Sequence, residues 1–135
     1  MDIKVERVLA APPETTWNIV SDFGGLKKWA PVDACSVEGR GLGSVRTVQG
    51  NGMIAKERLT ALDPHARTLK YQMIQQPDLP WTDYRARLAV AQTPTGCTVT
   101  WECSLTPLAA EEVITPMIER TFQEAFNRLA ALVEP

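Results

Sequence analysis

The sequence contains one histidine and three cysteines, and this scarcity limits the kinds of site it can form. Cys35, Cys97 and Cys103 form no CxxC pair, and with His65 alone they do not supply an ordinary zinc ligand set. We therefore expect no metal site. An odd number of cysteines also gives no disulfide framework, so we expect small, buried thiols in a reduced, cytoplasmic setting.

Long runs of like charge and long apolar runs are also missing. The net charge is −2 and no basic stripe is present, so we expect no nucleic-acid partner. No apolar run approaches the ~20 residues of a membrane-spanning helix, so we expect no stable membrane insertion. Residues 1–4 lead directly into a strand pattern without an apolar stretch, so we expect no signal peptide. At 135 residues, with 44% hydrophobic residues, the chain predicts a single globular domain, residues 1–135.

The sequence also lacks the motifs of common catalytic and cofactor sites. No Ser-His-Asp or Cys-His arrangement is recognisable, and His65 falls in a turn. Five of the eight glycines lie within residues 38–59, but this stretch has no GK[ST] end and does not open a helix. We therefore expect no cofactor. Glycine at this density instead indicates turns with positive φ or close backbone approach.

What is present is a strand, two short helices, six further strands and a long helix. Residues 2–10 alternate like a half-buried strand, and the two prolines that follow it suit the start of a helix. A break at 21–25 precedes a second short helix at 26–29. Alternating runs separated by short turns then predict an antiparallel meander of strands at 34–38, 44–49, 53–62, 67–75, 82–91 and 97–106.

Residues 109–133 have helical periodicity and a wide apolar stripe. Pro116 leaves two alternatives: the helix begins there, with Thr115 as N-cap, or it begins near residue 109 and is kinked at Pro116. We favour the second. Such a stripe needs a large apolar partner, and only the inner face of a strongly curved sheet is available. A sheet that wraps a helix in this way can leave a cavity.

The order of elements resembles the helix-grip fold of the SRPBCC or START-like superfamily, which includes birch-pollen-allergen-like proteins and the polyketide cyclase/dehydrase group. Three segments carry the resemblance. Gly41–Arg46 is similar to the G-x-G-[SA]-x-R turn of that group, Glu57–Asp63 to its E-R-L-x-x-L-D strand, and Leu79–Tyr84 to its L-P-x-x-[DN]-Y segment. The resemblance implies an α+β fold in which a curved, seven-stranded antiparallel sheet wraps a long C-terminal helix.

The same motifs occur in plant abscisic-acid receptors, whose gate and latch correspond to Gly50–Met53 and Gln76–Trp81. The chain departs from the receptors at the gate sequence, the latch sequence and Trp29, which replaces their hormone-binding lysine. Hormone reception is therefore not implied. The resemblance still implies a lid over a cavity, formed by Gly50, Asn51 and Gly52.

Glu57 is the residue that we expect to give the cavity its chemistry. If Met53 and Leu59 face inward, strand alternation brings Glu57 inward too, where a carboxylate needs a partner. It either contacts a ligand or acts as an acid or base, or else it pairs structurally with Arg46 or Arg58. In an enzyme, Glu57 would be the acid or base, and Arg46 or Tyr84 would orient an oxygen.

Further candidates share the inward phase of their strands, lie near the lid, or sit at the edge of the helical stripe. Glu102 is a conflict, because alternation places it outside and the receptor resemblance places it against a ligand. The expected ligand-binding set is Trp29, Met53, Glu57, Leu59, Tyr71, Met73, Leu79, Trp81, Tyr84, Glu102, Met117, Thr121 and Ala125.

Three functions remain open. The first is binding of a small, mostly hydrophobic molecule between the sheet and the last helix. The second is a polyketide cyclase or dehydratase on the same scaffold, and the third is a non-enzymatic, co-chaperone-like interaction module. The fold does not decide among them. The sequence also leaves open whether the protein is a monomer or a homodimer.

Overall fold

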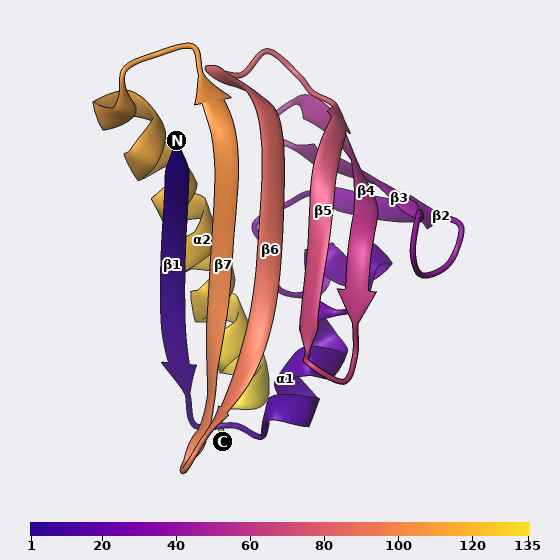
Figure 1. Ribbon diagram of the computed structural model, residues 1–135, viewed down its shortest axis with the longest axis vertical. Helices are drawn as coiled ribbons and strands as arrows, with labels where there is room; N and C mark the ends of the chain where they lie inside the picture. The colour runs from indigo at the N-terminus through magenta and orange to yellow at the C-terminus, as the bar shows by residue number, and fades with distance from the viewer.

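The computed structural model describes all residues from Met1 to Pro135 and has the predicted order of elements (Figure 1). Seven antiparallel strands form one open sheet in the order β1-β7-β6-β5-β4-β3-β2. The strands are β1 (Asp2–Leu9), β2 (Ala34–Glu38), β3 (Val45–Gly50), β4 (Met53–Asp63), β5 (Thr68–Gln75), β6 (Trp81–Thr93) and β7 (Gly96–Pro107). The helical segments are α1 (Pro13–Val20), the 3-10 helix η1 (Phe23–Lys28) and α2 (Glu111–Val133). The predicted α+β helix-grip architecture is confirmed.

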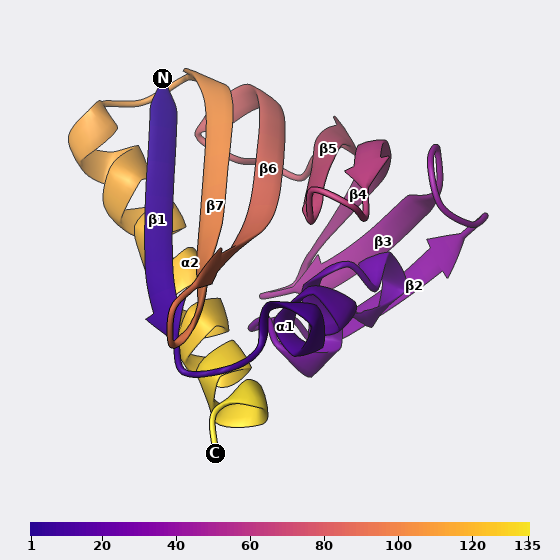
Figure 2. The same ribbon diagram turned by 60° about the horizontal axis from the view of Figure 1, so that its bottom comes forward.

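The sheet is strongly bent, so that its two ends form two limbs (Figure 2). One limb contains β1, β7 and β6, and the other contains β4, β3 and β2, with α1 at the end where the limbs approach each other. The long helix α2 runs along the inner side of the first limb and packs mainly on β1. No helix of the chain combines the length and the apolar composition needed to cross a bilayer.

Strands β5 and β6 are paired over only part of their length. Their pairing runs from Thr68↔Ala89 to Gln72↔Arg85 and then stops, while β5 continues along β4 and β6 continues along β7. An irregularity in β6 between Thr82 and Arg85 accompanies this separation. The connection between β5 and β6, which holds two of the chain's prolines, bridges the resulting gap, as expected of a segment unsuited to a central strand.

The core lies between the inner face of the first limb and α2. Trp101 on β7 stacks against Phe122 on α2, with ring centroids 4.0 Å apart and planes inclined by 8°. Phe126 and Leu129 on the same helical stripe are fully buried. Burying each such side chain contributes about 1.5–3 kcal/mol. This packing fixes the distance between the helix and the sheet.

Both η1 and α2 contain residues that disfavour helices. The second short helix extends over Phe23–Lys28 and includes Gly24, so the predicted break at 21–25 is wrong in part; Gly25, with φ of −95° and ψ of 18°, departs from helical geometry at a kink. A 3-10 turn is short enough to include glycines that would weaken a longer α-helix. In α2, the helix begins at Glu111 and contains Pro116, so the alternative in which Pro116 starts the helix is wrong.

Candidate functional site

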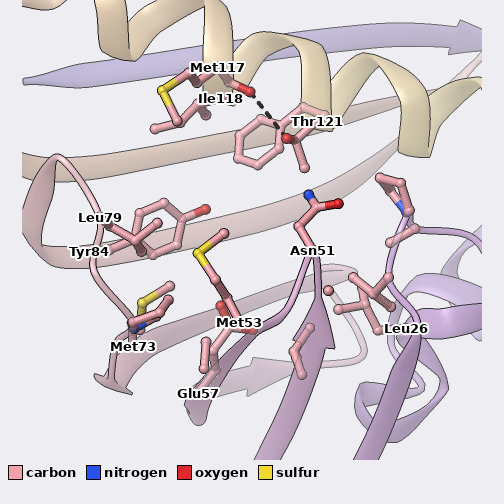
Figure 3. A pocket seen from close by; sticks show the side chains of 18 of the residues that line it. Leu26, Asn51, Met53, Glu57, Met73, Leu79, Tyr84, Met117, Ile118 and Thr121 are labelled. Carbon is pink, nitrogen blue, oxygen red and sulfur yellow. Dashed lines mark hydrogen bonds between the residues drawn. The ribbon is translucent and has the colours of Figure 1, made fainter.

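A pocket of ≈ 590 Å³ lies where β5 and β6 separate, between the sheet and α2 (Figure 3). This volume is within the usual range for small-molecule sites. Fifteen of its 24 lining residues are hydrophobic. They come from strands β3 to β7, from η1 and the segment after it, from the β5–β6 connection and from α2. The pocket is therefore apolar on most of its surface.

The polar end of the pocket is a buried ion pair between neighbouring strands. Arg46 on β3 and Glu57 on β4 are register partners, and Arg46 Nε donates a 2.7 Å hydrogen bond to Glu57 Oε1. Only 3% of Arg46 and 7% of Glu57 are exposed. Strand alternation places both side chains on the inner face. Glu57 thus pairs with Arg46, which is one of the alternatives that the sequence leaves open. Both residues also line the pocket, so the pairing does not exclude contact with a ligand.

Several contacts hold Arg46 in place. Its Nη1 donates to the backbone carbonyl oxygen of Phe23 at 3.3 Å. Its Cζ lies 4.1 Å from the ring centroid of Phe23 and 4.6 Å from that of Tyr71, so both rings make cation–π contacts with it. Burial alone would lower the pKa of Arg46, but the Glu57 carboxylate raises it, and the net shift is upward. Arg46 is thus a fixed cation beside the carboxylate.

Hydrogen bonds link three aromatic side chains next to the ion pair. Trp101 Nε1 donates to the Tyr71 hydroxyl at 3.0 Å, and the hydroxyls of Tyr71 and Tyr84 lie 3.4 Å apart. The Tyr84 hydroxyl points into the space enclosed by the pocket (Figure 3). Burial raises the pKa of both tyrosines, and the negative charge of Glu57 raises each further. Both phenols are therefore neutral hydrogen-bonding groups at physiological pH.

A tight hairpin between β3 and β4 forms one edge of the pocket. Gly50 pairs with Met53, which leaves a two-residue turn of Asn51 and Gly52 with φ of 52° and 73°. Positive φ at both positions is the type I′ geometry, for which Asn-Gly is the favoured sequence. Asn51 reaches from this turn toward Thr121 on α2 (Figure 3). The segment expected to be a lid is thus a well-defined hairpin at the rim.

Helix α2 forms the opposite wall. Met117 and Thr121 lie one turn apart, and Thr121 Oγ1 donates back to the Met117 carbonyl at 3.1 Å (Figure 3). The hydroxyl of Thr121 is therefore occupied by its own helix. Arg120 and Glu124, also one turn apart, add one positive and one negative charge to the lining.

Many residues expected at the site line one pocket. They come from separate segments that the fold brings together: Arg46, Met53, Glu57, Tyr71, Met73, Leu79, Trp81, Tyr84, Met117 and Thr121, with Gly50 and Asn51 of the expected lid.

Five expected residues do not line the pocket: four that lie in the core or in the hairpin turn, and Glu102. Trp29, Leu59 and Ala125 are fully buried in the hydrophobic core, and Gly52 lies in the hairpin turn without reaching the pocket. Trp29 packs against Trp101 with ring centroids 5.2 Å apart. These three core positions have the inward orientation expected of them, but neighbouring side chains cover them.

The resemblance to hormone receptors implied that Glu102 faces a ligand, and this expectation is wrong. Glu102 projects from the outer face of the sheet, because its neighbours Trp101 and Cys103 occupy the buried phase of β7. There it pairs with Arg87 on β6, with Arg87 Nη1 3.2 Å from Glu102 Oε1. The alternation of the strand was therefore the correct guide.

Sequence reasoning missed several lining residues. Val48 and Ala55 have the same inward phase as Arg46 and Glu57, so alternation could have identified them. Trp101 could have been found in the same way. The other missed residues come from the η1 region, from Pro77 and from α2: Leu26, Ala30, Pro31, Val32, Pro77, Ile118, Arg120, Phe122 and Glu124. Their inclusion depends on how segments meet in space, which strand periodicity does not describe.

The cysteines take no part in the pocket. All three are free thiols; Cys97 and Cys103 are buried and Cys35 is half-buried. Burial raises the pKa of Cys103 to about 11. No group of three or more His, Cys, Asp or Glu side chains is arranged to hold a metal ion.

Comparison with known proteins places this geometry in context. The family model described as "Polyketide cyclase / dehydrase and lipid transport" matches residues 1–134. A solution structure of a protein from Thermobifida fusca is 30% identical, with 96% of this chain and 90% of that chain covered and a TM-score of 0.83. A crystal structure of a Bacillus thuringiensis protein is 19% identical, covers 98% of both chains and has a TM-score of 0.86. No curated protein sequence matches the chain.

A further similar structure contains bound small molecules. It is norcoclaurine synthase from Thalictrum flavum in complex with dopamine and hydroxybenzaldehyde. It is 20% identical, with 98% of this chain and 85% of that chain covered and a TM-score of 0.78. At 20% sequence identity, this similarity supports a shared fold and nothing further.

Proposed function

Because the chain belongs to the polyketide cyclase/dehydrase and lipid-transport family, we propose that it binds a small, mostly hydrophobic molecule in the pocket between the sheet and α2. The ligand's apolar body lies against residues such as Met53, Leu79 and Met117. Its polar end lies near Glu57 and Tyr84. The Gly50–Met53 hairpin forms one side of the mouth through which the ligand enters.

One observation carries this proposal: a largely apolar pocket of ≈ 590 Å³ ends at a buried, charged pair. An apolar lining with a few convergent polar groups is the usual composition of a small-molecule site. Buried charges are costly, and an ion pair contributes less to stability than well-packed hydrophobic residues often would. Binding gives the pair a use that stability alone does not. The two aromatic molecules held by the structurally similar norcoclaurine synthase support the same reading.

A pocket-filling substitution tests the proposal. Ala55 lines the pocket from β4, so Ala55→Phe occupies the space in which a ligand would lie. The matched control is Ala61→Phe on the same strand, where Ala61 pairs with Lys70 and faces outward. We expect the wild type and Ala61→Phe to bind the neutral fluorescent probe N-phenyl-1-naphthylamine saturably, and Ala55→Phe to lose this binding while remaining folded. Equal binding by all three proteins would contradict the proposal.

An enzyme on the same scaffold is the second candidate. Glu57 contributes a carboxylate and Tyr84 a neutral phenol to the same pocket, a combination suited to removing a proton and orienting a carbonyl oxygen. Glu57→Gln separates the two functions, because an enzyme would lose turnover of a polyketide-type carbonyl substrate while retaining affinity for it. A carrier would show a change in affinity and no turnover in either form.

A further inference from the structure

Glu57 has far more hydrogen-bonding capacity than the protein uses. A carboxylate offers about four acceptor positions. Arg46 Nε fills one of them at 2.7 Å, and no other hydrogen bond to the Glu57 side chain is present. The residue is nevertheless 7% exposed and lines the pocket, so the remaining acceptor positions face the space that a ligand would occupy. Neither carboxylate oxygen is both fully buried and unpartnered, so these acceptor positions are open to a donor from the pocket.

More contacts hold Arg46 in place than hold Glu57. Its Nε is committed to Glu57 and its Nη1 to the Phe23 carbonyl, and its Cζ lies over two aromatic rings. Only 3% of the residue is exposed. Both residues line the pocket, but the side chain of Glu57 is 9% exposed and that of Arg46 only 3%, so the acceptor is the more accessible partner.

From this asymmetry we propose that the pocket selects ligands whose polar end is an uncharged hydrogen-bond donor, such as an alcohol or a phenol, and that Glu57 is the residue that makes this selection. The inference rests on the proposed function, since it specifies the chemistry of the ligand in the same pocket. It places carboxylic acids and amines, which are ionised at neutral pH, among the weakly bound compounds.

Ligand carboxylates are disfavoured by the charge of Glu57. A second anion would lie beside this carboxylate in a desolvated space, where like charges repel strongly. The neighbouring phenols of Tyr71 and Tyr84 already experience the same effect, because burial and the charge of Glu57 both oppose their ionisation. A group that makes phenolates unfavourable also makes a bound carboxylate unfavourable.

Ligand ammonium groups are disfavoured by Arg46. The fixed guanidinium is within hydrogen-bonding distance of Glu57, so a cation placed against the carboxylate would also meet a positive charge. The other charged lining residues, Arg120 and Glu124, have opposite signs and leave the lining with two positive and two negative charges. A neutral donor satisfies Glu57 without unbalancing this arrangement. The Tyr84 hydroxyl, which points into the same space, is a further uncharged hydrogen-bonding group.

A matched series of naphthalenes tests the inference with the wild-type protein. The probes are 2-naphthol, 2-methoxynaphthalene, 2-naphthoate and 2-naphthylmethylammonium, which share one apolar body and differ at the polar end. Affinities are measured by isothermal titration calorimetry at neutral pH. We expect 2-naphthol to bind about tenfold or more tightly than each of the other three, as a charge-assisted hydrogen bond would give.

The outcomes separate the inference from the proposed function. Binding of 2-naphthoate or the ammonium compound as tight as that of 2-naphthol overturns the inference and leaves ligand binding in place. Equal binding of the naphthol and its methyl ether does the same, because the ether lacks the donor. If none of the four probes binds, the proposed function itself is overturned.

Variants assign the selection to Glu57. In Glu57→Gln, the advantage of 2-naphthol over 2-naphthoate shrinks by about tenfold, because the amide has no charge to repel the acid. The matched control is Glu102→Gln, an identical change in another glutamate that pairs with an arginine on a neighbouring strand but faces outward. An unchanged preference in a folded Glu57→Gln protein contradicts the assignment. The wild-type series decides the ligand class even if that variant does not fold.

Discussion

Arg46 and Glu57 show how one ion pair can be structurally expensive and still determine the properties of a pocket. Both side chains lie on the inner face, where desolvation opposes their charges. Their 2.7 Å hydrogen bond and the aromatic rings around Arg46 offset this cost. Each residue is stabilised by the other, so removing either one leaves an uncompensated buried charge.

The first prediction concerns this dependence. Arg46→Met is expected to lower the free energy of unfolding by about 3–5 kcal/mol, because it leaves the Glu57 carboxylate without its partner. In the control, Arg87→Gln breaks the half-exposed pair with Glu102 and is expected to cost about 1 kcal/mol or less. Urea unfolding followed by tryptophan fluorescence measures both. Similar small losses in the two variants would show that the buried pair is not structurally coupled in this way.

The second prediction concerns the only two tyrosines in the chain, Tyr71 and Tyr84. Because burial raises the pKa of both, the folded protein should show no phenolate absorbance near pH 10, whereas in denaturant both phenols titrate there. Above pH 10 the unfolded chain then binds fewer protons than the folded one. Stability should therefore fall as pH rises, by up to ~1.4 kcal/mol per pH unit for each tyrosine.

A spectrophotometric alkaline titration checks this expectation. Phenolate should appear only together with the loss of native tryptophan fluorescence. A folded protein in which either tyrosine ionises near pH 10 would contradict the described burial. Tyr84→Phe should remove about half of the absorbance change on unfolding.

At the residue scale, periodicity predicted orientation well and depth poorly. Met53 and Leu59 correctly indicated that Glu57 faces inward, and the alternation of β7 correctly indicated that Glu102 faces outward. Alternation could not distinguish Leu59, which the core covers, from Glu57, two residues away, which lines the pocket. That difference depends on which other segments lie above each strand, and a single strand's sequence does not contain it.

At the element scale, the β3–β4 hairpin is held by its two-residue turn. The third prediction is that Gly52→Ala destabilises the protein by about 1–2 kcal/mol, because Gly52 has a φ of 73° that an L-residue with a Cβ adopts at a cost. Gln49→Ala, an exposed position on β3, is the control and should change stability by less than about 0.5 kcal/mol. Chemical denaturation measures both. A neutral Gly52→Ala would argue against the type I′ turn.

The fourth prediction concerns Pro116 within α2. Proline has no N–H to donate to the Glu112 carbonyl one turn earlier, and it is unfavourable inside a helix. Pro116→Ala should therefore raise the free energy of unfolding by about 1–3 kcal/mol. Thr115→Ala, the neighbouring position, controls for a general gain in helix propensity. A loss of stability in Pro116→Ala would show that the helix depends on the geometry that proline imposes.

The order and type of the elements could be predicted because each had a clear local signal. The predicted strands and the long helix agree with the structure to within a few residues at their ends. The exception is η1, which begins at Phe23 inside the predicted break, although Gly25 does interrupt its helical geometry. Short helices of this kind depend on what packs against them more than on propensity.

At the scale of the whole molecule, the fold followed from a mismatch that the sequence displays: a long helix with a wide apolar stripe and one sheet to receive it. The pocket did not follow in the same way. It exists because β5 and β6 stop pairing beyond Gln72↔Arg85 and because α2 packs mainly on β1, in the first limb of the sheet. The expectation of a cavity came from the same mismatch and that of a lid from the family resemblance, whereas the identity of the walls required the arrangement of the segments in space.

The claim that a small molecule binds between the sheet and α2 is tested most directly by NMR. The measurement is a ¹H–¹⁵N titration of the uniformly labelled protein with 2-naphthol. The account predicts chemical-shift changes concentrated at Gly50–Met53, Glu57, Tyr84 and Met117–Thr121, with little change at Lys4, Arg87 and Glu102 on the outer face. Changes centred on the outer face, or none at saturating probe, would contradict it.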